Sequence, residues 1–84
     1  MSPRQVIREP GKPVAVQFVP YPPTVMIIWL DDGLAIGVLL RQWLPHIQEA
    51  TTEQRNNYRL SDYGIHWPDL DQDISIAGLL GMSD

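Results

Sequence analysis

The spacing of apolar residues changes near residue 39, from a pattern typical of strands to one typical of helices. Residues 14–19 and 24–30 are rich in β-branched and aromatic residues, which predicts two strands. The second run is almost continuously apolar, as in a central strand covered on at least one face. The Asp-Asp-Gly sequence at residues 31–33 favours a tight reversal, because Asp-Gly suits the positive φ angles of a hairpin turn. Residues 34–38 are then the returning partner strand.

The helical pattern that follows contains a proline. Apolar residues recur at spacings of three and four, which predicts one apolar stripe formed by Leu39, Leu40, Trp43, Leu44 and Ile47. Pro45 removes a main-chain donor and clashes with the preceding turn, so we expect the helix to be interrupted near Leu44. Thr51 and Gln54 form a capping-box pattern, which predicts a short polar helix over residues 52–57.

Two more short strands are predicted at residues 58–61 and 64–67, and Pro68 ends the second because proline cannot donate to a sheet. Ser75 is suited to cap a last helical turn that ends at Gly81.

The sum is a small α+β domain with an antiparallel sheet of about five short strands and two short helices. The domain covers residues 14–81. Residues 1–13 contain three of the eight prolines and are expected to form a poorly ordered N-terminal arm.

Size, charge and cysteine content narrow the range of possible functions. At 84 residues the chain is near the lower limit for one hydrophobic core. The absence of cysteine excludes disulfides, thiolate metal sites and a cysteine nucleophile. The net charge of −4 disfavours nucleic acid as a partner of the whole chain. The charge is uneven, because Arg4, Arg8 and Lys12 lie in the arm while residues 60–84 hold five aspartates and no Lys or Arg.

A cytoplasmic location is expected. The N-terminus lacks the pattern of a signal peptide, and the longest apolar run, residues 25–30, is too short to span a bilayer. The lack of cysteine fits a reducing compartment.

Asp69, Asp71 and Asp73 have the spacing with which a calcium loop begins. The rest of that loop is missing, because its glycine position holds Ile74 and its bidentate glutamate position holds Leu80. We therefore expect no metal and no cofactor. The alternative for Asp69 and Asp73 is structural, in organising a turn and favouring a nearby helix N-terminus.

A catalytic site is not expected. His66 lies three residues before Asp69, and such a pair can form a general base, but neither Ser61 nor Ser75 lies in the context of an activated nucleophile. His46 is isolated, so no zinc site is predicted.

The three tryptophans are large for so small a core, and two of them are expected to fill it. Trp67, next to a proline and an acidic loop, is the candidate for an exposed interface anchor. The predicted partner-binding residues are His66, Trp67, Asp69, Asp71 and Asp73.

The sequence Gly-Ile-His-Trp-Pro-Asp-Leu-Asp-Gln-Asp-Ile-Ser-Ile-Ala-Gly-Leu-Leu at residues 64–80 resembles the bacterial family catalogued as domain of unknown function 2442. Residues 50–55, Tyr58 and the acidic-Gly hairpin at residues 28–33 are also similar to that family, and the likeness covers roughly residues 14–81. The chain departs from the pattern at Leu39, where a proline often opens the family's helix.

The resemblance implies a small cytosolic α+β domain of bacteria or archaea. Such proteins are often encoded beside a second small protein, in an arrangement like a toxin–antitoxin pair, and the family brings no catalytic residues with it. Some relatives carry an added helix-turn-helix domain. The leading hypothesis is a non-enzymatic protein-binding domain, the antitoxin-like member of such a module, which masks a small basic toxin-like protein from a neighbouring gene. The alternative is a DNA-binding accessory domain that uses the basic arm.

Overall fold

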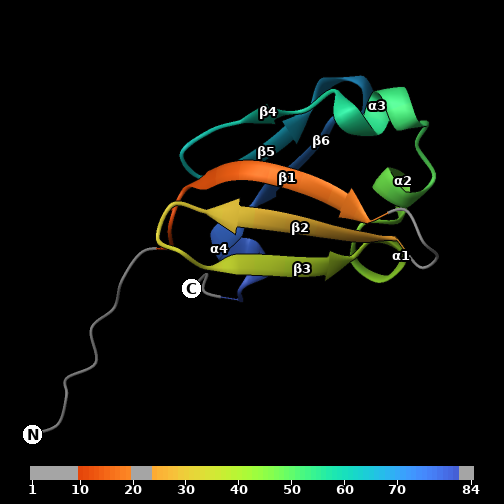
Figure 1. The fold of residues 1–84 in the computed structure, drawn as a ribbon. Helices are drawn as coiled ribbons and strands as arrows, with labels where there is room; N and C mark the ends of the chain where they lie inside the picture. Colours follow the sequence, from red (N-terminus) through yellow and green to blue (C-terminus); the bar gives the residue numbers. More distant parts are fainter. Residues whose placement is uncertain (1–9, 20–23, 82–84) are drawn as a thin grey trace, which may run out of the picture.

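Two three-stranded antiparallel sheets make up most of the fold. The computed structural model describes residues 10–19 and 24–81. The N-terminal sheet has the order β1-β2-β3 and contains β1 (Pro13–Val19), β2 (Val25–Leu30) and β3 (Ala35–Leu39). The C-terminal sheet has the order β4-β5-β6 and contains β4 (Arg59–Leu60), β5 (Gly64–Trp67) and β6 (Gln72–Ser75) (Figure 1). The prediction of an α+β fold is confirmed.

Short helices connect the two sheets and follow the last strand. Between β3 and β4 lie α1 (Leu40–Trp43), α2 (Pro45–Gln48) and α3 (Thr52–Asn56). A 3-10 turn, η1 (Pro68–Leu70), joins β5 to β6, and α4 (Ile76–Leu79) follows β6. Within the described ranges no helix is long and apolar enough to cross a bilayer.

The predicted helix boundaries and caps are confirmed, but the single apolar stripe is not, because Leu39 is in β3 and Trp43 is 63% exposed. The first helix ends at Leu44, whose φ of −138° is not helical, and Pro45 opens α2 at a position where a missing N–H costs nothing. The Thr51 hydroxyl accepts the Gln54 amide proton at 3.0 Å, and the Gln54 side chain accepts the Thr51 amide proton at 3.0 Å. Ser75 caps α4 in the same way, by accepting the Gly78 amide proton.

The β2–β3 reversal also matches the prediction, and it fixes the start of β1. Gly33 has a φ of +90°, which a side chain would resist. The Asp31 carboxylate accepts the Lys12 amide proton at 2.9 Å, and the Asp31 amide donates to the Lys12 carbonyl at 2.9 Å. Lys12 and Pro13, assigned to the arm from the sequence, are therefore attached to the sheet. Residues 1–9 of the predicted arm lie outside the described residues.

One strand of the C-terminal sheet, β6, was not predicted from the sequence. β6 pairs with β5 in the register Ile65↔Ile74 and His66↔Asp73. Ile74 is its only apolar residue, and the neighbouring aspartates give the segment the composition of a loop. The fold therefore has six described strands where about five were predicted, and its helical turns are more numerous and shorter than expected.

The hydrophobic core lies between the inner faces of the two sheets. Its buried residues come from β2, β3, the α1–α2 segment, β5 and α4, and they are Met26, Ile28, Leu30, Val38, Leu40, Leu44, Ile47, Ile65, Trp67 and Ile76. All of the buried β2 side chains are on one side of the strand, so the core covers one face of the N-terminal sheet.

Arg55 joins the helical segment to both sheets. Its guanidinium donates to the Ile47 carbonyl at 3.2 Å and to the Gln48 carbonyl at 2.8 Å, at the end of α2. The same group lies over the Phe18 ring of β1, 5.7 Å from the ring centroid. The Arg55 carbonyl accepts the Trp67 indole proton at 2.9 Å. One residue thus contacts α2, β1 and β5.

Gly64 and Gly37 are strand glycines with opposite surroundings. A Cβ at Gly64 would lie 1.9 Å from the Ile74 carbonyl oxygen, whereas a Cβ at Gly37 would have its nearest neighbour, a Val25 methyl, at 3.9 Å. Gly64→Ala should therefore lower the free energy of unfolding by about 1–3 kcal/mol or more, because the β5–β6 backbone must separate. Gly37→Ala is the matched control and should change the free energy of unfolding by less than about 1 kcal/mol. Urea unfolding followed by tryptophan fluorescence measures both, and equal effects would contradict the assignment.

Candidate functional site

The three predicted aspartates lie on the β5–β6 hairpin, but each has a different neighbour. The Asp69 carboxylate accepts from the Asn57 side-chain amide at 3.0 Å. Asp73 Oδ1 lies 2.5 Å from His66 Nδ1, across the register that pairs these two residues. Asp71 has the left-handed backbone, with a φ of 51°. All three aspartates are exposed, so the hairpin has an acidic surface. Their carboxylates do not converge on one point.

The prediction that Trp67 is an exposed interface anchor is wrong. Its exposed fraction is 0%, and its indole N–H is bonded to the Arg55 carbonyl. The reason is register: Ile65 and Trp67 face the core, while His66 between them faces outward with 42% of its side chain exposed. Trp67 therefore supports the predicted acidic surface from below and cannot touch a partner.

A shallow cavity of about 460 Å³ lies beside Asp71. Its lining is mostly polar and consists of His46, Glu49, Ala50, Gln54, Leu70, Asp71 and Gln72. Among the residues that the structure describes, no three His, Asp or Glu side chains are grouped so as to hold a metal ion.

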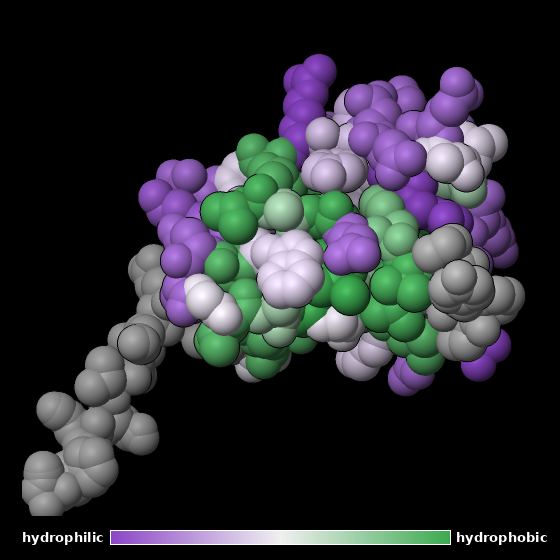
Figure 2. Space-filling view, in the orientation of Figure 1, coloured by the Kyte–Doolittle hydropathy of each residue, from purple (hydrophilic) through white to green (hydrophobic). Residues whose placement is uncertain are grey.

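A second surface, which the sequence analysis did not identify, is the outer face of the N-terminal sheet. The strand registers align its residues in three cross-strand rows: Ala15–Trp29–Ala35, Gln17–Ile27–Gly37 and Val19–Val25–Leu39. We call these nine residues the outer face. Gln17 is its only polar side chain, and the described helices lie on other sides of the sheet (Figure 1). Figure 2 shows a mainly hydrophobic surface over β1, β2 and β3.

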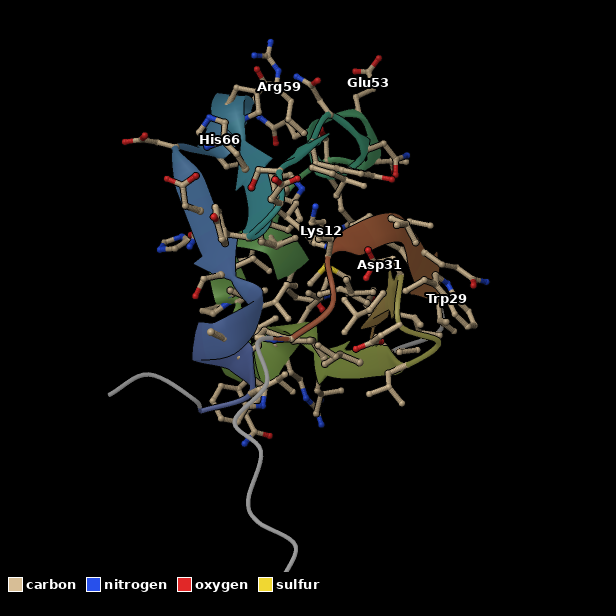
Figure 3. The ribbon with its side chains drawn as sticks, turned by 90° about the vertical axis from the view of Figure 1, so that its left-hand side faces the viewer. Lys12, Trp29, Asp31, Glu53, Arg59 and His66 are labelled. Carbon is tan, nitrogen blue, oxygen red and sulfur yellow. The ribbon has the colours of Figure 1, made fainter. Side chains whose placement is uncertain are left out.

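Trp29 is the largest residue of the outer face. Its exposed fraction is 45%. Its row neighbours Ala15 and Ala35 have only methyl groups, so no neighbouring side chain in the row can cover the indole. Trp29 and His66 point to opposite sides of the molecule, so the outer face and the acidic hairpin are separate surfaces (Figure 3).

The size of the outer face can be compared with apolar patches on other proteins. Three strands about 4.8 Å apart, each about six residues long at about 3.3 Å per residue, give an area of roughly 300 Å². The largest patch on a typical monomer has this size and is often functional.

Charged residues lie at both ends of the outer face. Asp31 and Asp32 follow β2 at one end, and the exposed Arg41 follows β3 at the other. The end of the outer face that holds Asp31 and Asp32 is acidic. Lys12 compensates part of this charge, and its ammonium group lies 3.8 Å from the Asp62 carboxylate.

The signal for the outer face was present in the sequence of β2. Val25, Ile27 and Trp29 are apolar, and so are the three residues that alternate with them. Such a strand is apolar on both sides, while the described part of the chain covers only one. The expectation that two tryptophans fill the core is also wrong, because Trp43 is 63% exposed in addition to Trp29.

Residues 15–83 match a family model described as a protein of unknown function, DUF2442. The chain belongs to the DUF2442 family. The resemblance that the β5–β6 hairpin sequence carries is thereby confirmed. Comparisons of this DUF2442 chain with curated proteins and with solved structures give no match.

Substitution of two tryptophans separates the exposed surface from the core of this DUF2442 protein. Trp67→Ala should lower the free energy of unfolding by about 3–5 kcal/mol, because it removes a fully buried side chain. Trp29→Thr should change the free energy of unfolding by less than about 1 kcal/mol, since threonine suits a strand and Trp29 contributes little to the core. Thermal and urea unfolding of both variants measure the difference. A loss at Trp29 as large as that at Trp67 would mean that the outer face belongs to the folding core.

Proposed function

We propose that this DUF2442 protein is a non-enzymatic protein-binding domain that contacts its partner through the outer face of the N-terminal sheet. The observation that carries the proposal is the exposed Trp29 on the central strand β2, in the end row of an outer face that is apolar except for Gln17. Burial of roughly 300 Å² of apolar surface is worth about 7 kcal/mol before the costs of association are subtracted. A partner therefore gains substantially from covering this face.

The composition of the outer face suits a protein interface. Tryptophan is enriched among the residues that dominate binding energy, and it acts best where smaller contacts exclude water around it. Ala15, Ala35 and Gly37 keep the surface around Trp29 low, so an apolar side chain of the partner can reach the indole. The polar and charged groups at the two ends would form the rim.

The charge of the chain favours a basic partner. The net charge is −4, and Asp31 and Asp32 lie at the end of the outer face. The exposed Asp69, Asp71 and Asp73, with His66 beside Asp73, add to the same field from the other side of the molecule. Such a field accelerates the encounter with a basic protein, while the apolar contacts hold the complex.

Within that class, the partner we propose is a small basic toxin-like protein encoded by a neighbouring gene, with this chain as the antitoxin-like member. This part of the proposal rests on the acidic charge and on what the family resemblance implies, namely that such proteins are often encoded beside a second small protein. The DNA-binding alternative depends on Arg4, Arg8 and Lys12. The first two lie outside the described residues, and the Lys12 ammonium group is 3.8 Å from the Asp62 carboxylate.

Co-expression with the product of the adjacent gene tests the proposal. The wild-type pair should co-purify as a stoichiometric complex. Trp29→Glu should raise the Kd at least about tenfold, because it replaces the largest apolar side chain of the proposed contact by a charge. Tyr63→Ala is the matched control: Tyr63 is an aromatic residue with 75% exposure in the β4–β5 turn, so its loss should leave the Kd unchanged.

The acidic hairpin should affect the rate of encounter only. Asp71→Asn combined with Asp73→Asn should slow association several-fold at low salt without changing dissociation. Equal Kd values for wild type and Trp29→Glu, or sequence-specific DNA binding by the chain alone at physiological salt, would overturn the proposed function.

A further inference from the structure

The edge of β3 has unpaired backbone groups. The Leu40 amide donates to the Thr24 carbonyl and the Leu30 amide to the Leu34 carbonyl, which fixes the alternation of the β2–β3 ladder. The N–H and C=O groups of Ala35, Gly37 and Leu39 therefore point away from β2. Within residues 10–19 and 24–81, β3 pairs with no strand other than β2, so these groups have no partner in a second strand. The Leu39 carbonyl alone is already bonded, because Leu39 is the N-cap of α1 and its carbonyl accepts the first hydrogen bond of that helix.

Natural edge strands usually carry a feature that prevents pairing with another chain, such as a charge, a proline or a bulge. The sequence of β3 is Ala-Ile-Gly-Val-Leu, and its register with β2 runs without a shift. None of those features is present between Ala35 and Leu39. As far as the described residues go, the edge of β3 is available for pairing with another strand.

Apolar groups lie beside this edge. Trp43 and Leu79 border a cavity of about 140 Å³ together with the three central residues of β3. Trp43 is 63% exposed, which is unusual for so large an apolar side chain. A chain that paired with β3 would cover Trp43 as well.

The edge is complementary to itself. In an antiparallel pair of two β3 strands centred on Gly37, Ala35 of one copy lies opposite Leu39 of the second copy. The outward-pointing groups then form four hydrogen bonds, in which each Gly37 amide donates to the other copy's Gly37 carbonyl and each Leu39 amide to the other copy's Ala35 carbonyl. The charges also match: Asp32 precedes β3 and Arg41 follows it, so Arg41 of one copy lies opposite the Asp32–Gly33 turn of the other. Both ends of the pair thus place a cation near a carboxylate.

We propose that two copies of the chain associate through antiparallel pairing of their β3 strands. The product is a twofold-symmetric dimer with one continuous six-stranded sheet, on which the two outer faces lie side by side. The roughly 300 Å² of one outer face becomes roughly 600 Å². A five-residue edge with Trp43 beside it is small for a specific interface, so the dimer should have a Kd in the micromolar range.

Sedimentation equilibrium of the chain alone, from about 1 µM to about 1 mM, tests the proposal. Gly37→Pro removes the central outward donor without touching the β2 ladder, and it should raise the dimer Kd at least about thirtyfold while leaving the circular dichroism unchanged. Gly37→Ala is the matched control, because it keeps the N–H and its Cβ meets nothing closer than 3.9 Å. Arg41→Glu should weaken the dimer about tenfold, whereas Arg59→Glu, on the C-terminal sheet, should not.

A second measurement on the unaltered chain decides the outcome even where Gly37→Pro does not fold. In a sample mixed from labelled and unlabelled copies, the proposed register brings the Ile36 Hα of one copy against the Val38 Hα of the other, which gives an intermolecular nuclear Overhauser effect. A chain that stays monomeric at about 1 mM overturns the proposal. A dimer without that signal, or a β3 edge protected only in a complex with a different protein, overturns it as well. These experiments need no partner, so their result is independent of the proposed function.

Discussion

Arg55 joins the two sheets through its side chain and its main-chain carbonyl together. It donates to two carbonyls at the end of α2, where the helix dipole favours a cation, and it lies over the Phe18 ring. Its own carbonyl holds the Trp67 indole. These contacts hold α2, α3 and β5 on the side of the inner face of the N-terminal sheet. The outer face is left without a covering layer from the described residues.

Small size is consistent with the described residues covering only one face of the N-terminal sheet. The core contains ten buried apolar residues, and all of those on β2 lie on one side of the strand. A domain this small buries a smaller fraction of its surface than a larger one, and the described residues form one core layer. The apolar side that the described residues leave uncovered is the surface that the proposed partner would cover. In the proposed function, the acidic hairpin on the opposite side of the molecule acts on the partner by its charge.

Local signals in the sequence predicted most of the elements, whereas the faces of the strands could not be predicted. Pro45, the Thr51–Gln54 capping box and the Asp-Asp-Gly turn each act within a few residues, and each is present as expected. The exposure of Trp67 depends on the register of β5, where a shift of one residue exchanges inside for outside. β6 was missed because its pairing with β5, and not its composition, makes it a strand. The outer face was not predicted because a continuously apolar strand such as β2 is expected whether one side of the sheet or both sides are covered.

Cross-saturation in the complex with the adjacent gene product tests most directly whether the outer face is the contact surface. The chain is deuterated and the partner's aliphatic protons are irradiated, so that signal loss marks the amides nearest to the partner. The account predicts the strongest losses along β1, β2 and β3 around Trp29, with little loss at residues 68–73 of the acidic hairpin. Losses confined to the hairpin, with the amides around Trp29 unaffected, would contradict it.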